Sequence, residues 1–282
     1  MSGPFKCPAR PARAVAALVV GLFLAQCDRV SPDAPPPVEE PAAVPIAPPP
    51  APTATPALSR RDLLDAVEQA SSVYAAGTPG PGADPLVGRT FAVRLPFACE
   101  GPVNPTAEEA PAGLARAIWA EDRRSIQLTL TPGDWTDTAL IATAGAAEVW
   151  ESVEGFWIPR PWLVTDDCPT IRRDPLQGGV TPTPQSVGLA AVFEAGSSRI
   201  GRRSGRAYRH TIRAEDDQPL TASPEGYRLM LKGRISRFPD GRAIRCHAAA
   251  PDQRPVCVVA TQLDTVAFQT VAGQTLGEWK TG

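Results

Sequence analysis

The side chains of this sequence that could do chemistry are concentrated in a few short stretches. Adjacent carboxylates occur at Asp166-Asp167, Glu108-Glu109 and Glu215-Asp216-Asp217, and the only histidines are His210 and His247. Carboxylate pairs can supply an acid and a base or bind calcium, and histidine can act as a base near neutral pH. Adjacent strand residues point to opposite faces, however, so spacing alone supports neither chemistry. We predict no catalytic residue and no metal site, and keep Asp166, Asp167 and His210 as candidates for an alternative, hydrolytic function.

Residues 149–162, VWESVEGFWIPRPW, form the most aromatic stretch of the chain, with Trp150, Phe156, Trp157 and Trp162. Tryptophan is largely buried on average, so these rings are expected either to fill one end of the folded body or to form a partly exposed platform. An exposed aromatic platform would suit a glycan or a protein partner. The second interpretation makes Trp157 and Trp162 candidate ligand-binding residues.

Residues 198–213, SRIGRRSGRAYRHTIR, are rich in arginine. Guanidinium groups bind carboxylate and phosphate well, so Arg202 and Arg203 are also candidate ligand-binding residues. The alternative is a solvated hairpin whose charge is neutralised by Glu215-Asp216-Asp217. The stretch lacks the lysine and hydroxyl residue of a phosphate-binding loop, and the chain has no dinucleotide-binding or common hydrolase motif, so no cofactor is predicted.

The charge balance limits the choice of partners. The chain has 28 basic and 30 acidic residues, a net charge of −2 that becomes more negative if a basic leader is removed. A mildly acidic protein is a poor electrostatic match for nucleic acid, which we therefore exclude as the main ligand.

The amino-terminal residues have the pattern of an export signal. Lys6, Arg10 and Arg13 precede an apolar run at residues 14–25, as in the charged and hydrophobic regions of a signal peptide. A helix of that length would span about 18 Å, less than the roughly 30 Å core of a bilayer. We therefore predict a signal peptide over residues 1–27.

The end of this segment, Leu24-Ala25-Gln26-Cys27, resembles the lipobox of bacterial lipoprotein signal peptides, although Gln26 stands where that pattern usually has a small residue. The resemblance implies cleavage before Cys27 and attachment of a lipid to its sulfur, which would anchor the protein to a membrane. A cleaved signal without lipid and an uncleaved anchor are the alternatives. Asp28 resembles the signal that retains enterobacterial lipoproteins in the inner membrane, but the membrane of residence stays open.

Residues 28–58 are rich in proline and include Pro35-Pro36-Pro37 and Pro48-Pro49-Pro50. Such a segment buries too little apolar surface to fold and favours an extended conformation. We predict a disordered linker that acts as a spacer behind the anchor. A simple tail and a proline-rich recognition segment are the other interpretations.

Four cysteines remain in the body of the chain: Cys99, Cys168, Cys246 and Cys257. An even number in an exported chain indicates disulfides. Residues 242–246 and 255–261 resemble the two strands of a hairpin, which would place Cys246 opposite Cys257 and leave Cys99 to pair with Cys168. A zinc site is the competing interpretation, but the spacings contain no C-x-x-C pair.

Residues 59–282 are predicted to fold as one β-rich exported domain or as two subdomains of about 59–180 and 181–282. Ser59 and Asp62 indicate the start of a helix whose apolar face includes Leu63 and Val67. Alternating patterns then predict strands at 90–95, 115–120, 125–130, 147–150, 188–193, 208–213, 227–235, 242–246, 255–261 and 264–269. The expected fold class is mostly β, an antiparallel sandwich or small barrels with one N-terminal helix. Gly233 is expected to mark either a bulge or a sharp bend.

These features together predict a membrane-anchored cell-envelope lipoprotein with a periplasmic body. Its β domain is expected to bind an envelope protein or glycan, or to have a structural role, without catalysis. An exported hydrolase that acts on an envelope polymer is the alternative function.

Overall fold

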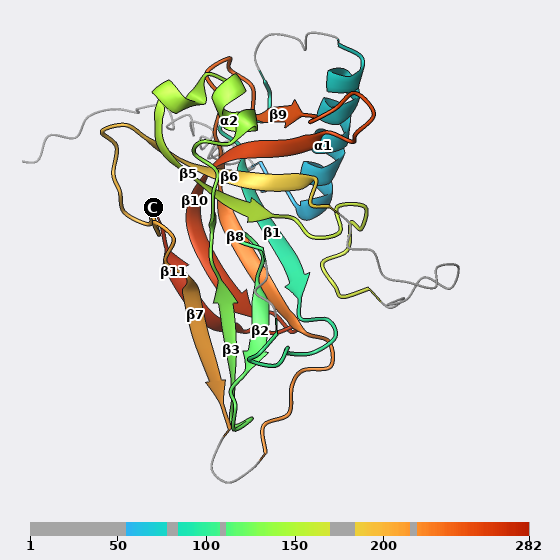
Figure 1. Ribbon diagram of the computed structural model, residues 1–282, viewed down its shortest axis with the longest axis vertical. Helices are drawn as coiled ribbons and strands as arrows, with labels where there is room; N and C mark the ends of the chain where they lie inside the picture. Colours follow the sequence, from blue (N-terminus) through green and yellow to red (C-terminus); the bar gives the residue numbers. More distant parts are fainter. Residues whose placement is uncertain (1–54, 78–83, 108–110, 170–183, 215–218, 282) are drawn as a thin grey trace, which may run out of the picture. The chain divides into compact units, whose positions relative to one another are not determined.

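The computed structural model describes residues 55–281 apart from 78–83, 108–110, 170–183 and 215–218. Residues Thr53–Gly282 form one compact unit. Its described part contains two β-sheets, the N-terminal helix α1 (Arg60–Ala75) and a short helix α2 (Ala139–Thr143) (Figure 1). The prediction of a mostly β body with an N-terminal helix is confirmed. The expected signal peptide, Cys27 and the linker up to residue 54 lie outside the described residues.

The larger sheet is organised around one long strand, β10. Its strands are β1 (Thr90–Phe97), β4 (Gly133–Asp134), β5 (Trp150–Trp157), β6 (Val187–Glu194), β8 (Tyr227–Ile235), β9 (Ile244–His247), β10 (Val256–Gln269) and β11 (Thr275–Lys280). The main order is β1-β8-β10-β6-β5-β4. The first half of β10 pairs with β9 and β6, and its second half with β8 and β11. The β6–β10 pair is parallel, so this sheet is mixed, while its other described pairs are antiparallel.

The smaller sheet is antiparallel, with the order β2-β3-β7, and consists of β2 (Arg116–Trp119), β3 (Ser125–Leu130) and β7 (Tyr208–Arg213). Alternate residues of β3, Ile126 and Leu128 among them, share a buried core with Leu229 and Phe268 of the larger sheet. Both sheets are open in the described part of the chain, which corresponds to packed sheets and not to the small-barrel alternative. Because β3 pairs with β7 and β1 with β8, a division near residue 180 would separate hydrogen-bonded neighbours.

Helix α1 begins with the predicted capping box. The Ser59 hydroxyl accepts the Asp62 N–H, and the Asp62 carboxylate accepts the Ser59 N–H, which satisfies two donors at the helix start. Leu63 and Val67 are buried against the body, and the helix packs against β1, β9 and β10. The preceding residue, Leu58, already forms a bridge with Phe91 of β1, so the folded body includes this last residue of the expected linker.

Some of the predicted strand boundaries differ from the observed ones, because a continuous apolar run does not show where a strand starts or ends. Residues 147–150 were expected to be a strand, but a 3-10 helix at Ala146–Glu148 precedes β5, which continues through most of the aromatic stretch. The expected strands at 255–261 and 264–269 form the single strand β10, and β11 was missed. The expected bulge at Gly233 has its extra residue, Asp264, on the partner strand β10. A Cβ atom at Gly233 would lie 2.1 Å from the Gln262 carbonyl oxygen, so only glycine permits this close approach.

A second apolar cluster contains Trp135, Ile141 of α2, Trp150 and Phe238. Trp135 lies directly over Gly155 of β5, where an added Cβ would come within 1.9 Å of the indole ring. The glycine therefore provides the space that the tryptophan fills. Because neighbouring residues of a strand face opposite sides, Glu154 and Phe156 point away from this cluster toward the core between the sheets.

The predicted disulfides Cys99–Cys168 and Cys246–Cys257 are both present. Cys246 and Cys257 are direct partners in the β9–β10 register, as the hairpin argument requires. Two disulfides indicate an oxidising compartment outside the cytoplasm. Within the described ranges, no group of histidine, cysteine or acidic side chains is placed to hold a metal ion. No helix of the described chain is both long and apolar enough for a membrane span.

Candidate binding site

The loop after β5 carries Trp162. Arg60, the first residue of α1, is hydrogen-bonded to this loop. The Arg60 side chain is 2% exposed, and it donates hydrogen bonds to the carbonyl oxygens of Pro159 (2.8 Å), Arg160 (3.1 Å) and Leu163 (3.0 Å). Burial lowers the pKa of Arg60 to about 10. A buried guanidinium is stabilised here mainly by backbone carbonyls, so it fixes the path of the loop.

The far end of the same loop is fixed by a disulfide and a second buried arginine. Cys168 is linked to Cys99, just after β1. Arg228 of β8 is 9% exposed, and it donates to the Asp166 carbonyl oxygen (2.9 Å) and to the Asp167 carboxylate. The loop is therefore tied to α1 at one end and to β1 and β8 at the other.

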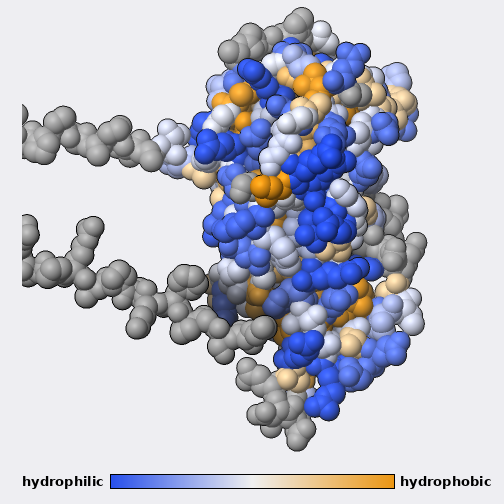
Figure 2. Space-filling view, turned by 90° about the vertical axis from the view of Figure 1, so that its left-hand side faces the viewer, coloured by the Kyte–Doolittle hydropathy of each residue, from blue (hydrophilic) through white to orange (hydrophobic). Residues whose placement is uncertain are grey.

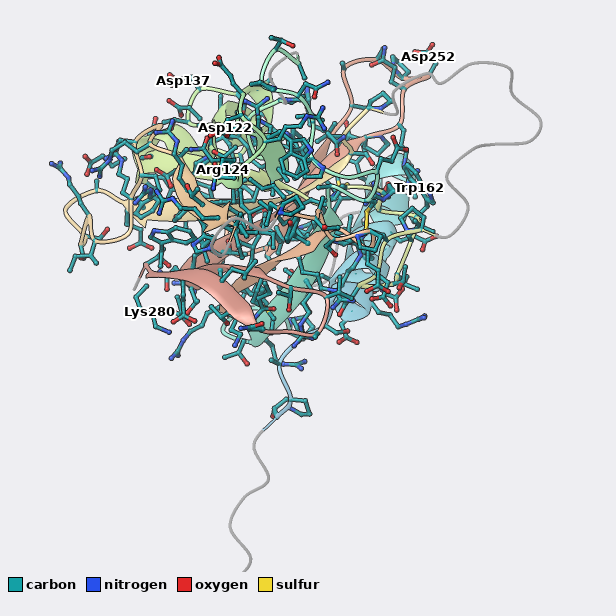
Figure 3. All side chains as sticks on the ribbon, turned by 90° about the horizontal axis from the view of Figure 1, so that it is seen from below. Asp122, Arg124, Asp137, Trp162, Asp252 and Lys280 are labelled. Carbon is teal, nitrogen blue, oxygen red and sulfur yellow. A yellow bond between two sulfur atoms is a disulfide. The ribbon has the colours of Figure 1, made fainter. Side chains whose placement is uncertain are left out.

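These ties shape an open hollow of about 800 Å³. Its lining includes Glu100, Val103, Arg160, Trp162, Leu163 and Asp167. Trp162 is 54% exposed and lies at the periphery of the body near α1 (Figure 3). Ligand sites typically combine an apolar surface for contact with a few polar groups that orient the ligand. The exposed indole of Trp162 and the charged and hydroxyl groups beside it form such a combination.

The backbone at the rim of the hollow is strained. Ala98 and Arg160 both line it, and both have positive φ angles, 51° and 50°. Residues with a side chain rarely adopt this conformation, and such positions often occur at functional sites. The Arg160 side chain also donates to the Pro96 carbonyl oxygen (3.1 Å), which holds the strained turn against the end of β1.

The candidates for hydrolysis do not form a common group. The Asp166 carboxylate lies 3.8 Å from Arg94, and the Asp167 carboxylate is paired with Arg228. His210 lies on β7 in the other sheet, opposite Leu128, and burial lowers its pKa. The acidic runs at 108–109 and 215–217 both lie outside the described residues.

The aromatic stretch divides into buried and exposed rings. Trp150 is buried beside Phe238, with ring centroids 5.1 Å apart, and Trp157 packs on Trp135 at 4.5 Å. Trp162 alone among the tryptophans of this stretch is mostly exposed. The structure thus places Trp162 in the hollow and Trp157 in packing contacts, and it does not bring the two together as one platform.

Part of the arginine stretch is neutralised locally by Glu151, while the expected run at 215–217 lies outside the described residues. Arg199 and Arg202 both pair with Glu151, at 2.6 and 3.0 Å, and Glu151 is the extra residue of a bulge in β5. Arg203 donates to the carbonyl oxygens of residues 206 and 207, and its guanidinium lies 4.6 Å from the centre of the Tyr208 ring. Arg202 and Arg203 are therefore already engaged within the described chain.

Sequence reasoning missed one functional candidate, the buried carboxylate of Glu154. It is 4% exposed and lies on the core face of β5. The alternation of the strand could have located it, because Glu154 shares a face with Phe156, but the predicted strand ended at residue 150.

The fold and its sites define an exported, disulfide-linked, mostly β domain with a tryptophan-lined hollow. Comparisons of the chain with protein-family models, with curated proteins and with solved structures found no match. Its function is therefore argued from the sites themselves.

Proposed function

We propose that this chain is a lipid-anchored lipoprotein of a bacterial envelope, and that its β domain binds an envelope glycan in the Trp162 hollow without catalysis. The lipobox-like Leu24-Ala25-Gln26-Cys27 and the proline-rich segment behind it support the anchor. The two disulfides support a body that faces an oxidising compartment.

The observation that carries the binding proposal is the exposed ring of Trp162 on a loop held by Arg60 and Cys168. A sugar presents a face of C–H groups, which can lie on the indole, and hydroxyl groups, which can bond to Glu100, Arg160 or Asp167. A ring held in place beforehand loses little conformational entropy on binding. A hollow of about 800 Å³ is within the range of small-ligand sites, which favours a few sugar units over a flat protein surface.

The anchor is tested by fractionation of cells that express the full chain. Wild-type protein should sediment with membranes and carry acyl chains on Cys27 by mass spectrometry. Cys27→Ser should leave the protein uncleaved or move it to the soluble fraction. A soluble wild-type protein without acyl chains would refute the anchor.

The binding site is tested with full-length protein extracted in detergent, by co-sedimentation with peptidoglycan sacculi and by titration with chito-oligosaccharides. Trp162→Ala should weaken binding at least tenfold, since buried aromatic anchors are worth about 2 kcal/mol or more. Tyr74→Ala is the matched control, because Tyr74 is 42% exposed and lies outside the hollow. Equal binding by wild type and Trp162→Ala, or binding only to envelope proteins, would contradict the glycan proposal.

A further inference from the structure

A second pocket, of about 260 Å³, lies where β6 ends, beside the bulge of β10 and the loop that leads to β7. Its lining includes Glu154, Phe193, Ile200, Tyr208, Leu263 and Asp264. Figure 2 shows the side of the molecule that carries β7 and β11 in Figure 1, and hydrophilic residues cover most of it, with hydrophobic residues in small separate groups. This side therefore presents no broad apolar surface among the described residues, and a ligand there would have to use a local site such as the pocket.

Glu154 is the buried charge of this pocket. One of its oxygens, Oε1, accepts hydrogen bonds from the backbone N–H groups of Arg203 and Ser204, both at 2.7 Å. Its other oxygen, Oε2, accepts no hydrogen bond from the described residues. Burial raises the pKa of Glu154, although the two N–H bonds act in the opposite direction. Oε2 is not enclosed, and Glu154 lines the pocket, so this oxygen remains available as an acceptor for a ligand.

The loop that holds Glu154 is rigidly shaped around it. Ser204 has a positive φ of 49°, which lets two successive N–H groups point at one oxygen. Gly201 also has a positive φ, and a Cβ atom there would lie 2.2 Å from the Thr281 carbonyl oxygen. Thr281 in turn donates to the carbonyl oxygens of Leu263 and Asp264. The loop, the C-terminal end and the bulge are thus packed together around the pocket.

The bulge adds a second carboxylate. Asp264 has no partner on β8 because it is the extra residue of β10, and bulges commonly redirect a side chain next to a functional site. With Glu194, the lining holds three carboxylates and no lysine, arginine or histidine. The two arginines that act on the charge of Glu154 are Arg202 and Arg203. Arg202 is paired with Glu151, and the Arg203 guanidinium donates to backbone carbonyl oxygens. The described pocket therefore favours a positively charged ligand.

The arrangement discriminates against a metal ion and in favour of an organic cation. The three carboxylates belong to no group of described residues placed to hold a metal. Phe193, Ile200 and Leu263 supply apolar walls, against which a chain of methylene groups can lie while its charged end meets a carboxylate. We propose that this pocket binds an aliphatic primary ammonium group, from either a free diamine or a lysine side chain, with Glu154 Oε2 as its main acceptor.

The test is a calorimetric titration of the full chain in detergent with two probes, cadaverine and Nα-acetyl-lysine amide. Their neutral counterpart, Nα,Nε-diacetyl-lysine amide, should not bind. Glu154→Gln keeps an oxygen for the two N–H groups but removes the charge, and should weaken binding at least tenfold. Asp264→Asn, at an exposed position, should weaken it about threefold. Glu278→Gln is the matched control, because Glu278 is an exposed acid of β11 paired with Lys280 and does not line the pocket.

The outcomes separate the sources of the ligand. Binding of cadaverine alone identifies a free diamine, and binding of the lysine derivative alone identifies a lysine side chain. The proposal is overturned if neither probe binds, if the diacetylated compound binds equally well, or if Glu278→Gln causes the same loss as Glu154→Gln. If Glu154→Gln does not fold by circular dichroism, unchanged binding by Asp264→Asn overturns the proposal on its own.

Discussion

Arg60 and Glu154 are both almost fully buried charges, at 2% and 4% exposed, but they are accommodated in different ways. Arg60 donates three hydrogen bonds to carbonyl oxygens of one loop. Glu154 accepts two N–H groups on one oxygen and leaves the other oxygen at a pocket. Neither has an opposite charge in direct contact within the described chain, so the backbone supplies most of the stabilisation in both cases.

The difference separates a structural charge from one that is open to a ligand. The Nη1 atom of Arg60 also lacks a partner, but it is enclosed, and Asp166 favours the guanidinium charge from a distance. Nothing from solution can reach that atom without local unfolding. The unpaired oxygen of Glu154 borders a cavity, where a ligand can reach it. Arg60 thus shapes the neighbouring Trp162 hollow without touching a ligand, whereas Glu154 would bind one directly.

Removal of the Cys99–Cys168 disulfide should have the largest effect. In the chain-entropy model, the 69-residue separation corresponds to about 4 kcal/mol of stability, against about 3 kcal/mol for the 11-residue separation of Cys246–Cys257. Urea unfolding of Cys99→Ser/Cys168→Ser and of Cys246→Ser/Cys257→Ser measures both. At low urea the first variant should lose glycan binding and keep ammonium binding. Loss of both activities in a folded protein would show that the two sites are not independent.

Arg60→Met should be the next largest change. It leaves three loop carbonyl oxygens without their donor, and an unpaired buried polar group costs about 1 to 3 kcal/mol. Because the loop can partly rehydrate, we expect a total loss of about 3 kcal/mol in the free energy of unfolding. Hydrogen exchange of the backbone amides at residues 162–166 should also become faster, because the loop is no longer held by Arg60. Arg61→Met is the control, since Arg61 is the exposed neighbour on the same helix turn, and an equal loss there would contradict the role given to Arg60.

Local patterns in the sequence were sufficient for much of the fold. The capping box at Ser59, the strands at 208–213 and 227–235, and the hairpin that pairs Cys246 with Cys257 all depend on neighbouring residues. The parallel contact between β6 and β10 and the missed strand β11 depend on contacts between distant parts of the chain. Periodicity carries no information about such contacts.

The sites were less predictable for the same reason. Trp162 was identified from its residue type, but its exposure depends on Arg60, about 100 positions away. Arg202 is paired with Glu151, the extra residue of the bulge in β5, which the sequence does not reveal, and the expected neutralising run at 215–217 lies outside the described residues. Glu154 was missed because the predicted strand ended at residue 150, and its carboxylate is bound by the backbone of Arg203 and Ser204, about 50 positions away, which periodicity does not reveal.

The smallest effect on stability is expected for Glu154→Gln. Whether this variant is more or less stable than the wild type tests whether Glu154, unlike Arg60, is a ligand-binding charge and not a structural one. Burial favours the protonated form of Glu154, so the folded protein has a higher pKa there than the unfolded chain, whose value is about 4.3. Above the raised pKa, the folded state must hold a buried charge that the unfolded chain solvates, and this lowers stability. Below about pH 4.3 both states are protonated and the penalty disappears. Tyr208 does not titrate in this range, because burial raises its pKa further above its usual value.

The glutamine variant carries no charge, so without ligand it should melt at or slightly above the wild-type temperature at pH 8. The difference in melting temperature should then shrink as the pH falls through the raised pKa of Glu154. Differential scanning calorimetry from pH 8 to pH 4, with Glu278→Gln as a control that shows no such trend, measures this directly. Cadaverine should reverse the order by stabilising only the wild type, since a ligand that binds the folded state raises its melting temperature. If the variant is less stable than the wild type at every pH, the ionised carboxylate of Glu154 stabilises the loop that carries Arg203 and Ser204, much as Arg60 stabilises the loop after β5. The distinction between a structural charge and a ligand-binding charge would then be wrong.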